Sequence, residues 1–351
     1  MKRRHFLQNT AAAGMGAAAA GSGLSMFGAA GEALAAREGK GLSSLRTIVI
    51  VKTTNSGYWQ VVLAGAKKAV ADFGIQGLKF TGSPIGEADI AGEVALLENA
   101  IVQKPDFIVC APTSATGLTA TIEKAAAAGI PLIQIDSAST AKHYTAFLQT
   151  NNVGGGVLIA DALAAAIKAK TGAAAGQIAY STFLSNVGSL GQRDQGFRQG
   201  IAKYPGLKIV KHNDAGGDQT TKPISIVADT LTAFPNLVGY FCDNLYTIAG
   251  ALTAFSEKKV NTKKVSLVGW DASPAIAAAL QAGTLDGLLL QNPYMQGYGG
   301  VVYGILAALH VVVPSYQDTG SAVVTPANVS VPAINALLKS NEGMPGMKLG
   351  F

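Results

Sequence analysis

Short apolar runs alternate with segments of helical periodicity along most of the chain. In the first half, apolar runs of strand length lie at 47–53, 78–80, 107–110, 132–135 and 146–150. Segments with helical spacing lie between them at 59–73, 90–103 and 116–128. The last of these is followed by Gly129 and Pro131, residues that commonly end a helix. Strands that alternate with helices predict a parallel sheet covered by helices on both faces.

The same pattern restarts in the second half of the chain. Strands are expected at 177–181, 207–210, 239–242, 265–270 and 287–290, with helices near 157–169, 190–203, 222–234, 246–256, 274–282 and 296–309. The run FIVC that ends at Cys110 matches GYFC ending at Cys242, and LIQID ending at Asp136 matches SLVGWD ending at Asp271. The predicted fold class is therefore α/β, with two similar Rossmann-like lobes that each hold a parallel sheet.

This architecture indicates where a ligand would bind. Ligands of open parallel sheets bind beyond the carboxyl ends of the strands, and two such lobes can border one cleft. The residues that follow the predicted strands are polar and rich in amides, with aromatic side chains at Tyr58 and Trp59. Carboxylate and amide groups bind hydroxyls, while an aromatic ring covers the C–H face of a sugar. A neutral, hydroxyl-rich ligand is expected.

The N-terminus has the features of an export signal. Arg3 and Arg4 precede Phe6 and Leu7, a weakly apolar stretch of small residues follows, and Ala33-Leu34-Ala35 offers a small-x-small cleavage site. We interpret residues 1–35 as a signal peptide of the twin-arginine type, which sends the protein to the periplasm.

Composition narrows the function classes further. The 351 residues suffice for two ordinary domains, and the formal charge of +6 falls to +4 without the signal. This mild charge forms no basic cluster, so no nucleic-acid partner is expected. No apolar run after the signal looks long enough to span a membrane. Cys110 and Cys242 each end an apolar run and are expected to be buried thiols.

Enzyme signatures are absent from the sequence. The turn TTNSGYW after the first strand lacks the glycine pattern of dinucleotide-binding sites, and no GxSxG, Walker or HExxH motif occurs. Asp136 and Asp271 could be proposed as a glycosidase pair, which makes a hydrolytic enzyme a less favoured alternative. The prediction is a non-enzyme with no catalytic residues, no metal site and no cofactor.

Seven ordered segments resemble the ribose-type periplasmic sugar-binding proteins, the substrate-binding subunits of ATP-driven (ABC) sugar importers. They include TTNSGYWQVVLAGAKKA, QTNNVGGGVLIADAL, FCDNLYTIAGALTAF, SLVGWDASPAIAAALQAG and LLLQNPYMQGYGGV, and the resemblance covers about residues 46–310. It implies a type I periplasmic binding protein fold, with a hinge between two lobes.

The resemblance and the strand-end positions together give one predicted ligand-binding set. The resemblance implies contacts at Asn55, Ser56, Tyr58, Trp59, Asp136, Asn244, Asp271 and Gln291, and we add Ser137, Asn186 and Arg193. Ribose binders carry an arginine at the position of Ser137, and they carry an aromatic residue near 214–218, where this chain has Ala215-Gly216-Gly217. A sugar other than ribose, or a polyol, is therefore expected.

Several of these residues also have a structural interpretation. Asp136 and Asp271 could cap the helices that follow them, and so could Asn244. Trp59 could be a core residue, and Arg193 fits an RxxGF pattern whose arginine is more often structural. Gly154-Gly155-Gly156 is interpreted as the start of a helix near a hinge and not as a phosphate-binding loop.

The predicted organisation follows from the resemblance. After the signal at 1–35 and a linker at 36–45, the N-terminal lobe comprises 46–151 plus 292–320, and the C-terminal lobe comprises 152–291 plus 321–351. The expected function is capture of a sugar or polyol in the cleft and delivery to an ABC transporter permease, by a monomer. The alternative is a sensory binding protein that presents its ligand to a chemoreceptor or a sensor kinase.

Overall fold

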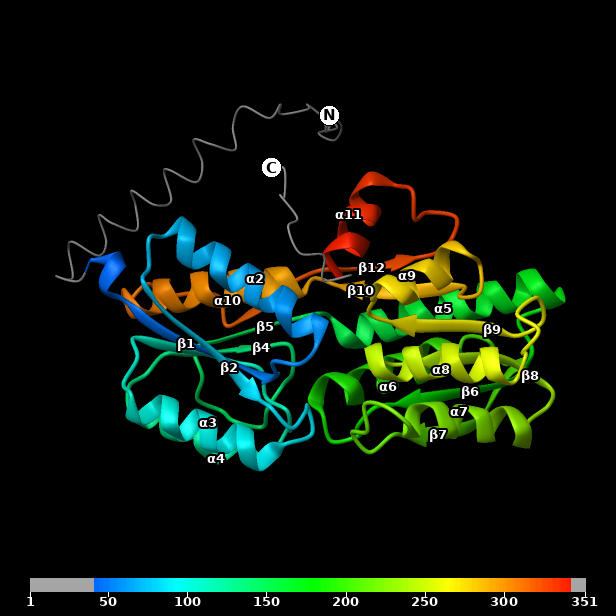
Figure 1. The fold of residues 1–351 in the computed structure, drawn as a ribbon, viewed down its shortest axis with the longest axis horizontal. Coiled ribbons are helices and arrows are strands. Elements are labelled where there is room, and N and C mark those ends of the chain that lie inside the picture. The colour runs from blue at the N-terminus through cyan, green and yellow to red at the C-terminus, as the bar shows by residue number, and fades with distance from the viewer. Residues whose placement is uncertain (1–40, 342–351) are drawn as a thin grey trace, which may run out of the picture.

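The computed structural model describes residues 41–341, which form two lobes side by side (Figure 1). The predicted signal at 1–35 and the first part of the predicted linker lie outside the described residues. A short 3-10 helix, η1 (Leu42–Ser44), leads into the first lobe.

The first lobe is built on a six-stranded sheet in the order β11-β5-β4-β3-β1-β2. Its strands are β1 (Arg46–Thr53), β2 (Gly77–Ser83), β3 (Phe107–Cys110), β4 (Leu132–Ile135), β5 (Ala146–Gln149) and β11 (Tyr316–Asp318). All of these neighbours pair in parallel. The central strands β3, β4 and β5 are buried at every position, as expected for a sheet covered on both faces.

The second lobe repeats this arrangement in the order β12-β10-β9-β8-β6-β7. Its strands are β6 (Gly176–Thr182), β7 (Leu207–Asp214), β8 (Leu237–Cys242), β9 (Ser266–Trp270), β10 (Gly287–Gln291) and β12 (Ser321–Val324). Only the edge strand differs in direction, because β12 pairs antiparallel with β10 whereas β11 runs parallel to β5.

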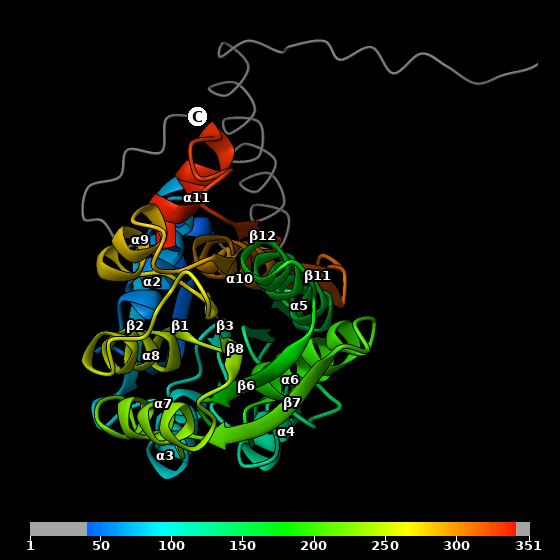
Figure 2. The same ribbon diagram turned by 90° about the vertical axis from the view of Figure 1, so that its right-hand side faces the viewer.

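Helices cover both faces of each sheet, and the two halves of the chain exchange one helix. The helices are α2 (Gly57–Asp72), α3 (Ile90–Val102), α4 (Thr119–Ala127), α5 (Asn152–Thr171), α6 (Gly188–Ile201), α7 (Lys222–Ala233), α8 (Leu245–Glu257), α9 (Pro274–Gln281), α10 (Pro293–Ala308) and α11 (Pro332–Asn341). Helix α10 follows the second sheet but packs with α2 over the first sheet, and α5 follows the first sheet but packs with α6 over the second (Figures 1 and 2).

Glycines allow each exchanged helix to pack closely against its partner. A Cβ on Gly65 of α2 would lie closer than 3.0 Å to the carbonyl oxygen of Tyr294 in α10. A Cβ on Gly196 of α6 would lie equally close to the carbonyl oxygen of Val153 in α5. The predicted helix start at Gly154-Gly155-Gly156 is confirmed, since these residues form the first turn of α5, where Asn151 accepts a hydrogen bond from the Gly154 amide (2.9 Å).

The predicted fold class is confirmed, and the predicted strands and helices all occur with small shifts at their ends. The pattern did not predict β11, β12 and α11. Strand β11 has three residues and a mostly exposed burial pattern, so it lacks the apolar run on which the prediction relied.

Helix α5 corrects one expectation about apolar segments. An 18-residue window of this 20-residue helix has a mean hydropathy of 1.3, so by length and composition within residues 41–341 it could cross a membrane. In the structure it is a core helix of the second lobe, where Ile159, Leu163 and Ile167 are fully buried against the sheet. Cys110 and Cys242 are both buried and free, as predicted.

Candidate ligand-binding cleft

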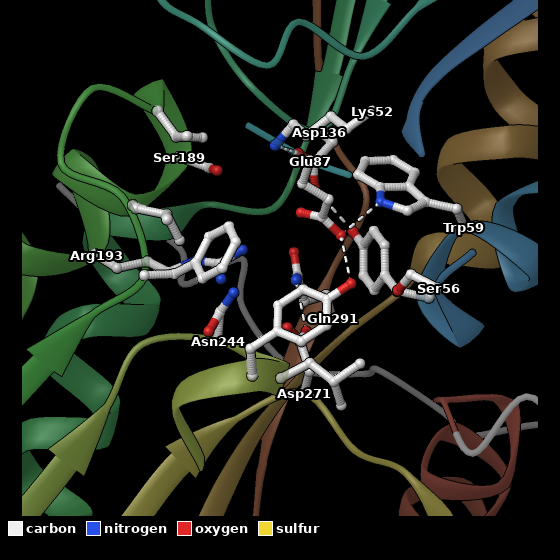
Figure 3. A pocket seen from close by; sticks show the side chains of 16 residues that line it. Lys52, Ser56, Trp59, Glu87, Asp136, Ser189, Arg193, Asn244, Asp271 and Gln291 are labelled. Carbon is white, nitrogen blue, oxygen red and sulfur yellow. Dashed lines mark hydrogen bonds and ion pairs between the residues drawn. The ribbon is translucent and has the colours of Figure 1, made fainter. Parts of the chain in front are cut away.

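A cavity lies where the carboxyl ends of the strands of both sheets meet (Figure 3). Its volume in this structure is about 30 Å³, so the lining side chains lie close together. The first lobe contributes Lys52, Ser56, Tyr58, Trp59, Glu87 and Asp136, and the second contributes Phe183, Val187, Ser189, Leu190, Arg193, Asn244, Leu245, Tyr246, Asp271 and Gln291. The lining combines charged groups, amides and aromatic rings.

Two aspartates occupy equivalent positions in the two lobes. Asp136 follows β4 and Asp271 follows β9, and both have a left-handed backbone, with φ of 64° and 68°. The Asp136 amide donates to the Leu148 carbonyl and the Asp271 amide donates to the Leu289 carbonyl, each at 3.0 Å. The left-handed conformation is uncommon outside glycine, so both backbones are held in an unusual turn that directs a carboxylate into the cleft.

Asp136 is paired with a buried cation. Lys52 Nζ lies 2.8 Å from Asp136 Oδ2 and donates to Ser137 Oγ at 2.7 Å. Burial alone would raise the pKa of Asp136, but Lys52, Arg193 and the hydrogen bonds outweigh it, so the pKa lies below its ordinary value. The hydroxyl of Tyr58 adds a contact to Oδ1 at 2.9 Å. Asp136 is therefore an ionised hydrogen-bond acceptor at neutral pH.

Asp271 has a more weakly charged environment. Gln291 Nε2 donates to Asp271 Oδ1 at 2.6 Å, and the Leu245 backbone amide also donates to this carboxyl. Burial raises the pKa of Asp271, and the nearby Arg193 guanidinium offsets this only in part. Its carboxyl thus binds protons more readily than that of Asp136.

Arg193 combines a structural role with a place in the cavity wall. Its Nε donates to Asn152 Oδ1 (3.0 Å) and its Nη1 donates to the Asp243 carbonyl (2.8 Å). The guanidinium also lies 4.3 Å from the centre of the Trp270 ring. These bonds fix the position of a positive charge between the two aspartates, which supports both interpretations of this residue.

Aromatic rings line the cavity from both lobes. Tyr58 and Trp59 meet edge to face, with centroids 4.9 Å apart. In the second lobe, the ring centroids of Phe183 and Tyr246 lie 5.1 Å apart. Phe183 and Tyr246 thus provide an aromatic surface in the second lobe, although the stretch at 214–218 has none.

The structure brings eight of the eleven predicted site residues to the cavity wall and places three elsewhere. Those at the wall are Ser56, Tyr58, Trp59, Asp136, Arg193, Asn244, Asp271 and Gln291. Asn55 is exposed and donates to the Pro84 carbonyl (3.0 Å), while Asn186 is exposed and its carbonyl accepts from the Ala115 amide (3.2 Å). Ser137 is buried behind Asp136, where it bonds Lys52 and Ser189.

Sequence reasoning missed half of the cavity wall. Lys52 lies inside a strand, and its apolar neighbours suggested only a core position. Its position next to the carboxyl end of the predicted strand 47–53 was the available signal. Glu87 lies in the loop between β2 and α3, and it does not directly follow a predicted strand. Lys52 supplies the positive charge that the serine at position 137 does not.

The structural interpretation holds for some of these residues and fails for others. Asn244 caps α8 in a capping box with Thr247, and it also lines the cavity. Asp271 caps no helix of its own, since Ser273 caps α9. Trp59 is only 1% exposed, so it is both a core residue and part of the wall. Within residues 41–341 there is no cluster of three or more histidine, cysteine or carboxylate side chains that could hold a metal ion.

Comparison with known proteins identifies the family. The sequence profile described as "Periplasmic binding protein domain" matches residues 47–307, which is most of the chain. This chain belongs to the periplasmic binding protein family. The matched segment spans both lobes and every strand whose end borders the cavity.

Curated relatives of this periplasmic binding protein bind sugars. The ribose import binding protein of Salmonella typhimurium is 24% identical over 253 residues, covering 72% of this chain and 81% of the relative. The D-allose-binding periplasmic protein of Escherichia coli is 25% identical over 260 residues, with the same coverage. Such relatives are sugar-binding transport proteins and not enzymes, in agreement with the prediction from sequence.

Solved structures agree with the fold and include sugar complexes. A carbohydrate transporter solute-binding protein from Agrobacterium radiobacter, in complex with D-arabinose, is 40% identical, with a TM-score of 0.81, and covers 84% of this chain and 99% of that one. An ABC transporter solute-binding protein from Agrobacterium vitis with bound D-fucose is 31% identical, with a TM-score of 0.77 and the same coverage. The fold of this periplasmic binding protein is therefore that of ABC-transporter sugar-binding proteins.

Proposed function

We propose that this protein captures a neutral monosaccharide or a polyol in the cleft between its lobes. The observation that carries the proposal is the cavity at the strand ends, where Asp136 and Asp271 face one space from opposite lobes. Relatives that bind D-arabinose, D-fucose, ribose or D-allose support a monosaccharide as the ligand class.

The charges in the cavity wall favour a neutral ligand. Lys52 and Arg193 are offset by Asp136 and Asp271, and Glu87 adds a carboxyl whose pKa is raised by burial. An ionic ligand would leave one of these groups without its partner, which is costly in a buried site. Hydroxyl groups can instead donate to the carboxylates and accept from the cations.

Binding is expected to work as a clamp. Three short connections join the lobes, after β5, after β10 and between β11 and β12. The predicted lobes, 46–151 plus 292–320 and 152–291 plus 321–351, would rotate about them. A sugar stabilises the closed form because only that form contacts it from both sides. We expect a dissociation constant in the micromolar range or lower, which corresponds to a binding free energy of about −8 kcal/mol or stronger.

We further propose that the loaded protein delivers its sugar to the permease of an ABC transporter as a monomer in the periplasm. The twin arginines Arg3 and Arg4 would direct its export. Changing both to lysine should leave the full-length protein in the cytoplasm, as seen by cell fractionation. Normal export of this variant would exclude the twin-arginine route.

Thermal-shift and calorimetric titrations of residues 36–351 test the ligand class. The panel would contain D-arabinose, D-fucose, D-ribose, D-allose and inositol, with amino acids and nucleosides as controls. A ligand present at 100 times its dissociation constant adds about 2.7 kcal/mol of stability, which is readily measured. Binding of only amino acids or nucleosides would contradict the sugar assignment. Tyr303→Phe, on α10 and outside the cavity wall, is a suitable control variant.

A further inference from the structure

Glu87 is a cavity residue whose contacts cross the cleft. It lies in the loop between β2 and α3 of the first lobe. Its Oε1 accepts a hydrogen bond from Trp59 Nε1 (2.8 Å) in the same lobe and another from Tyr246 Oη (3.2 Å) at the start of α8 in the second lobe (Figure 3). One oxygen therefore joins the aromatic rings of both lobes.

Other hydrogen bonds also join the lobes, and they differ from this one. At the hinge, Thr150 Oγ1 donates to Gln291 Oε1 (2.9 Å). The Ala115 amide donates to the Asn186 carbonyl (3.2 Å), and Ser137 Oγ lies 2.9 Å from Ser189 Oγ. Asn186 and Ala115 are outside the cavity wall, and Ser137 is behind it. Of these four contacts, only the Glu87–Tyr246 bond has both partners in the wall that faces the ligand.

The carboxyl group of Glu87 has capacity for a further donor. Trp59 and Tyr246 both bond Oε1, and no donor among residues 41–341 bonds Oε2. Burial raises the pKa of Glu87, and Lys52 offsets this only in part. A carboxylate that has lost much of its water is stabilised strongly by each hydroxyl that donates to it.

We propose that Glu87 is a positioning residue that couples sugar binding to closure of the cleft. Oε2 accepts a hydroxyl of the sugar, while Oε1 holds Trp59 and Tyr246 against each other across the cleft. The Tyr246 bond forms only when the lobes meet, so it slows reopening of the loaded protein. This inference rests on the proposed function.

The test separates closure from sugar contact by comparing two variants. Tyr246→Phe removes the cross-cleft hydrogen bond to Glu87, together with the interaction of the same hydroxyl with Ser56, but keeps Glu87 and the ring. With a sugar that the wild type binds, stopped-flow measurements should show a dissociation rate about 5–10 times higher and an association rate within about twofold of the wild type. Glu87→Ala should raise the dissociation constant more, since it also removes the contact to the sugar.

A double-variant cycle and a conformational readout make the result specific. Tyr246→Phe should add less loss to Glu87→Ala than it causes alone, because the Glu87 partner of its hydroxyl is then missing and only the Ser56 interaction remains. Small-angle scattering with saturating sugar should show a larger mean radius of gyration for Tyr246→Phe than for the control Tyr303→Phe. An unchanged dissociation rate in Tyr246→Phe, or additive losses in the double variant, would overturn the inference. Absence of sugar binding by the wild type would instead overturn the proposed function.

Discussion

Asp136 and Asp271 show how one backbone design supports two carboxyl groups whose pKa values shift in opposite directions. Both follow a central strand, both have a left-handed φ, and both amides donate to the neighbouring strand. Their partners differ, since Asp136 contacts the Lys52 ammonium whereas Asp271 contacts the Gln291 amide. The pKa is lowered at the first position and raised at the second. The repeated fold sets where a carboxyl group points, and its neighbours set the direction in which its pKa shifts.

Replacing each aspartate by asparagine should give the largest difference in unfolding free energy between the two lobes. Asp136→Asn leaves the Lys52 ammonium, 5% exposed, without its anionic partner, which should cost about 3–5 kcal/mol of unfolding free energy. Asp271→Asn replaces a carboxyl of raised pKa by a neutral group of similar shape and should cost about 1 kcal/mol or less. Urea unfolding of the sugar-free protein measures both. Equal losses would show that the two environments do not differ.

The helix crossings provide a second test of the repeat, where the lobes should behave alike. Gly65→Ala in the first lobe and Gly196→Ala in the second each force a Cβ against a backbone carbonyl of the exchanged helix. Each should cost about 1–3 kcal/mol. Gly191→Ala is the matched control in α6, because nothing lies within 4 Å of its Cβ position. That variant should stabilise the protein by up to about 1 kcal/mol.

Each lobe also holds a buried carboxyl behind the cleft that should make stability depend on pH. Burial raises the pKa of Glu93 from 4.5 to about 8, despite the hydrogen bond from the Thr113 amide, and it raises that of Asp243 from 3.8 to about 7. Between the ordinary and the raised pKa the folded protein binds more protons than the unfolded chain. Unfolding free energy should therefore fall as pH rises from 5 to 8.

Glu93→Gln tests how much of this pH dependence comes from the buried carboxyl of the first lobe. The amide keeps an acceptor for the Thr113 amide but does not titrate. The difference in melting temperature between pH 5 and pH 8 should shrink by roughly 2–4 °C for each kcal/mol removed. Asp243→Asn should act in the same direction but less between pH 5 and pH 8, because its raised pKa of about 7 lies lower in this range. A pH profile unchanged in both variants would contradict the assignment.

The smallest expected effect is at Asn244, where cap and cavity coincide. Asn244→Ala removes the side chain that accepts from the Thr247 amide (3.0 Å), at a cost of about 1 kcal/mol. A lower melting temperature of the sugar-free protein is therefore expected together with weaker sugar binding. Asn244→Ser, which can still cap the helix, should recover the stability but not the affinity. Full recovery of both would show that Asn244 serves only as a cap.

The sequence predicted the fold well because the fold depends on local pattern. Buried strands such as β3 and β4 are short apolar runs between helices, and Gly129 marks the end of the helix before β4. The edge strands β11 and β12 depend instead on which sheet the chain reaches after α10. That choice is a tertiary contact, which local pattern does not encode.

The candidate site was predicted where it follows strand ends and missed where it depends on packing. Asp136, Asp271 and Gln291 lie at ends of parallel strands, so topology alone places them together. Lys52 was missed because its burial depends on a charged partner. That partner, Asp136, lies 84 residues away in the sequence, so local pattern does not reveal it. Glu87 was missed because its role comes from contacts with Trp59 and Tyr246, one of them in the other lobe.

The exchange of α5 and α10 has a consequence for the order in which the protein can be completed during synthesis. The second lobe receives its covering helix, α5, before any of its own strands are made. The first lobe has β1 to β5 early, but one face of that sheet stays uncovered until α10 emerges from the ribosome. Domains usually fold in the order in which they are made. Here the sheet of the first lobe is fully covered only after strands β6 to β10 of the second lobe have been made, so the two halves are completed together at the end of the chain.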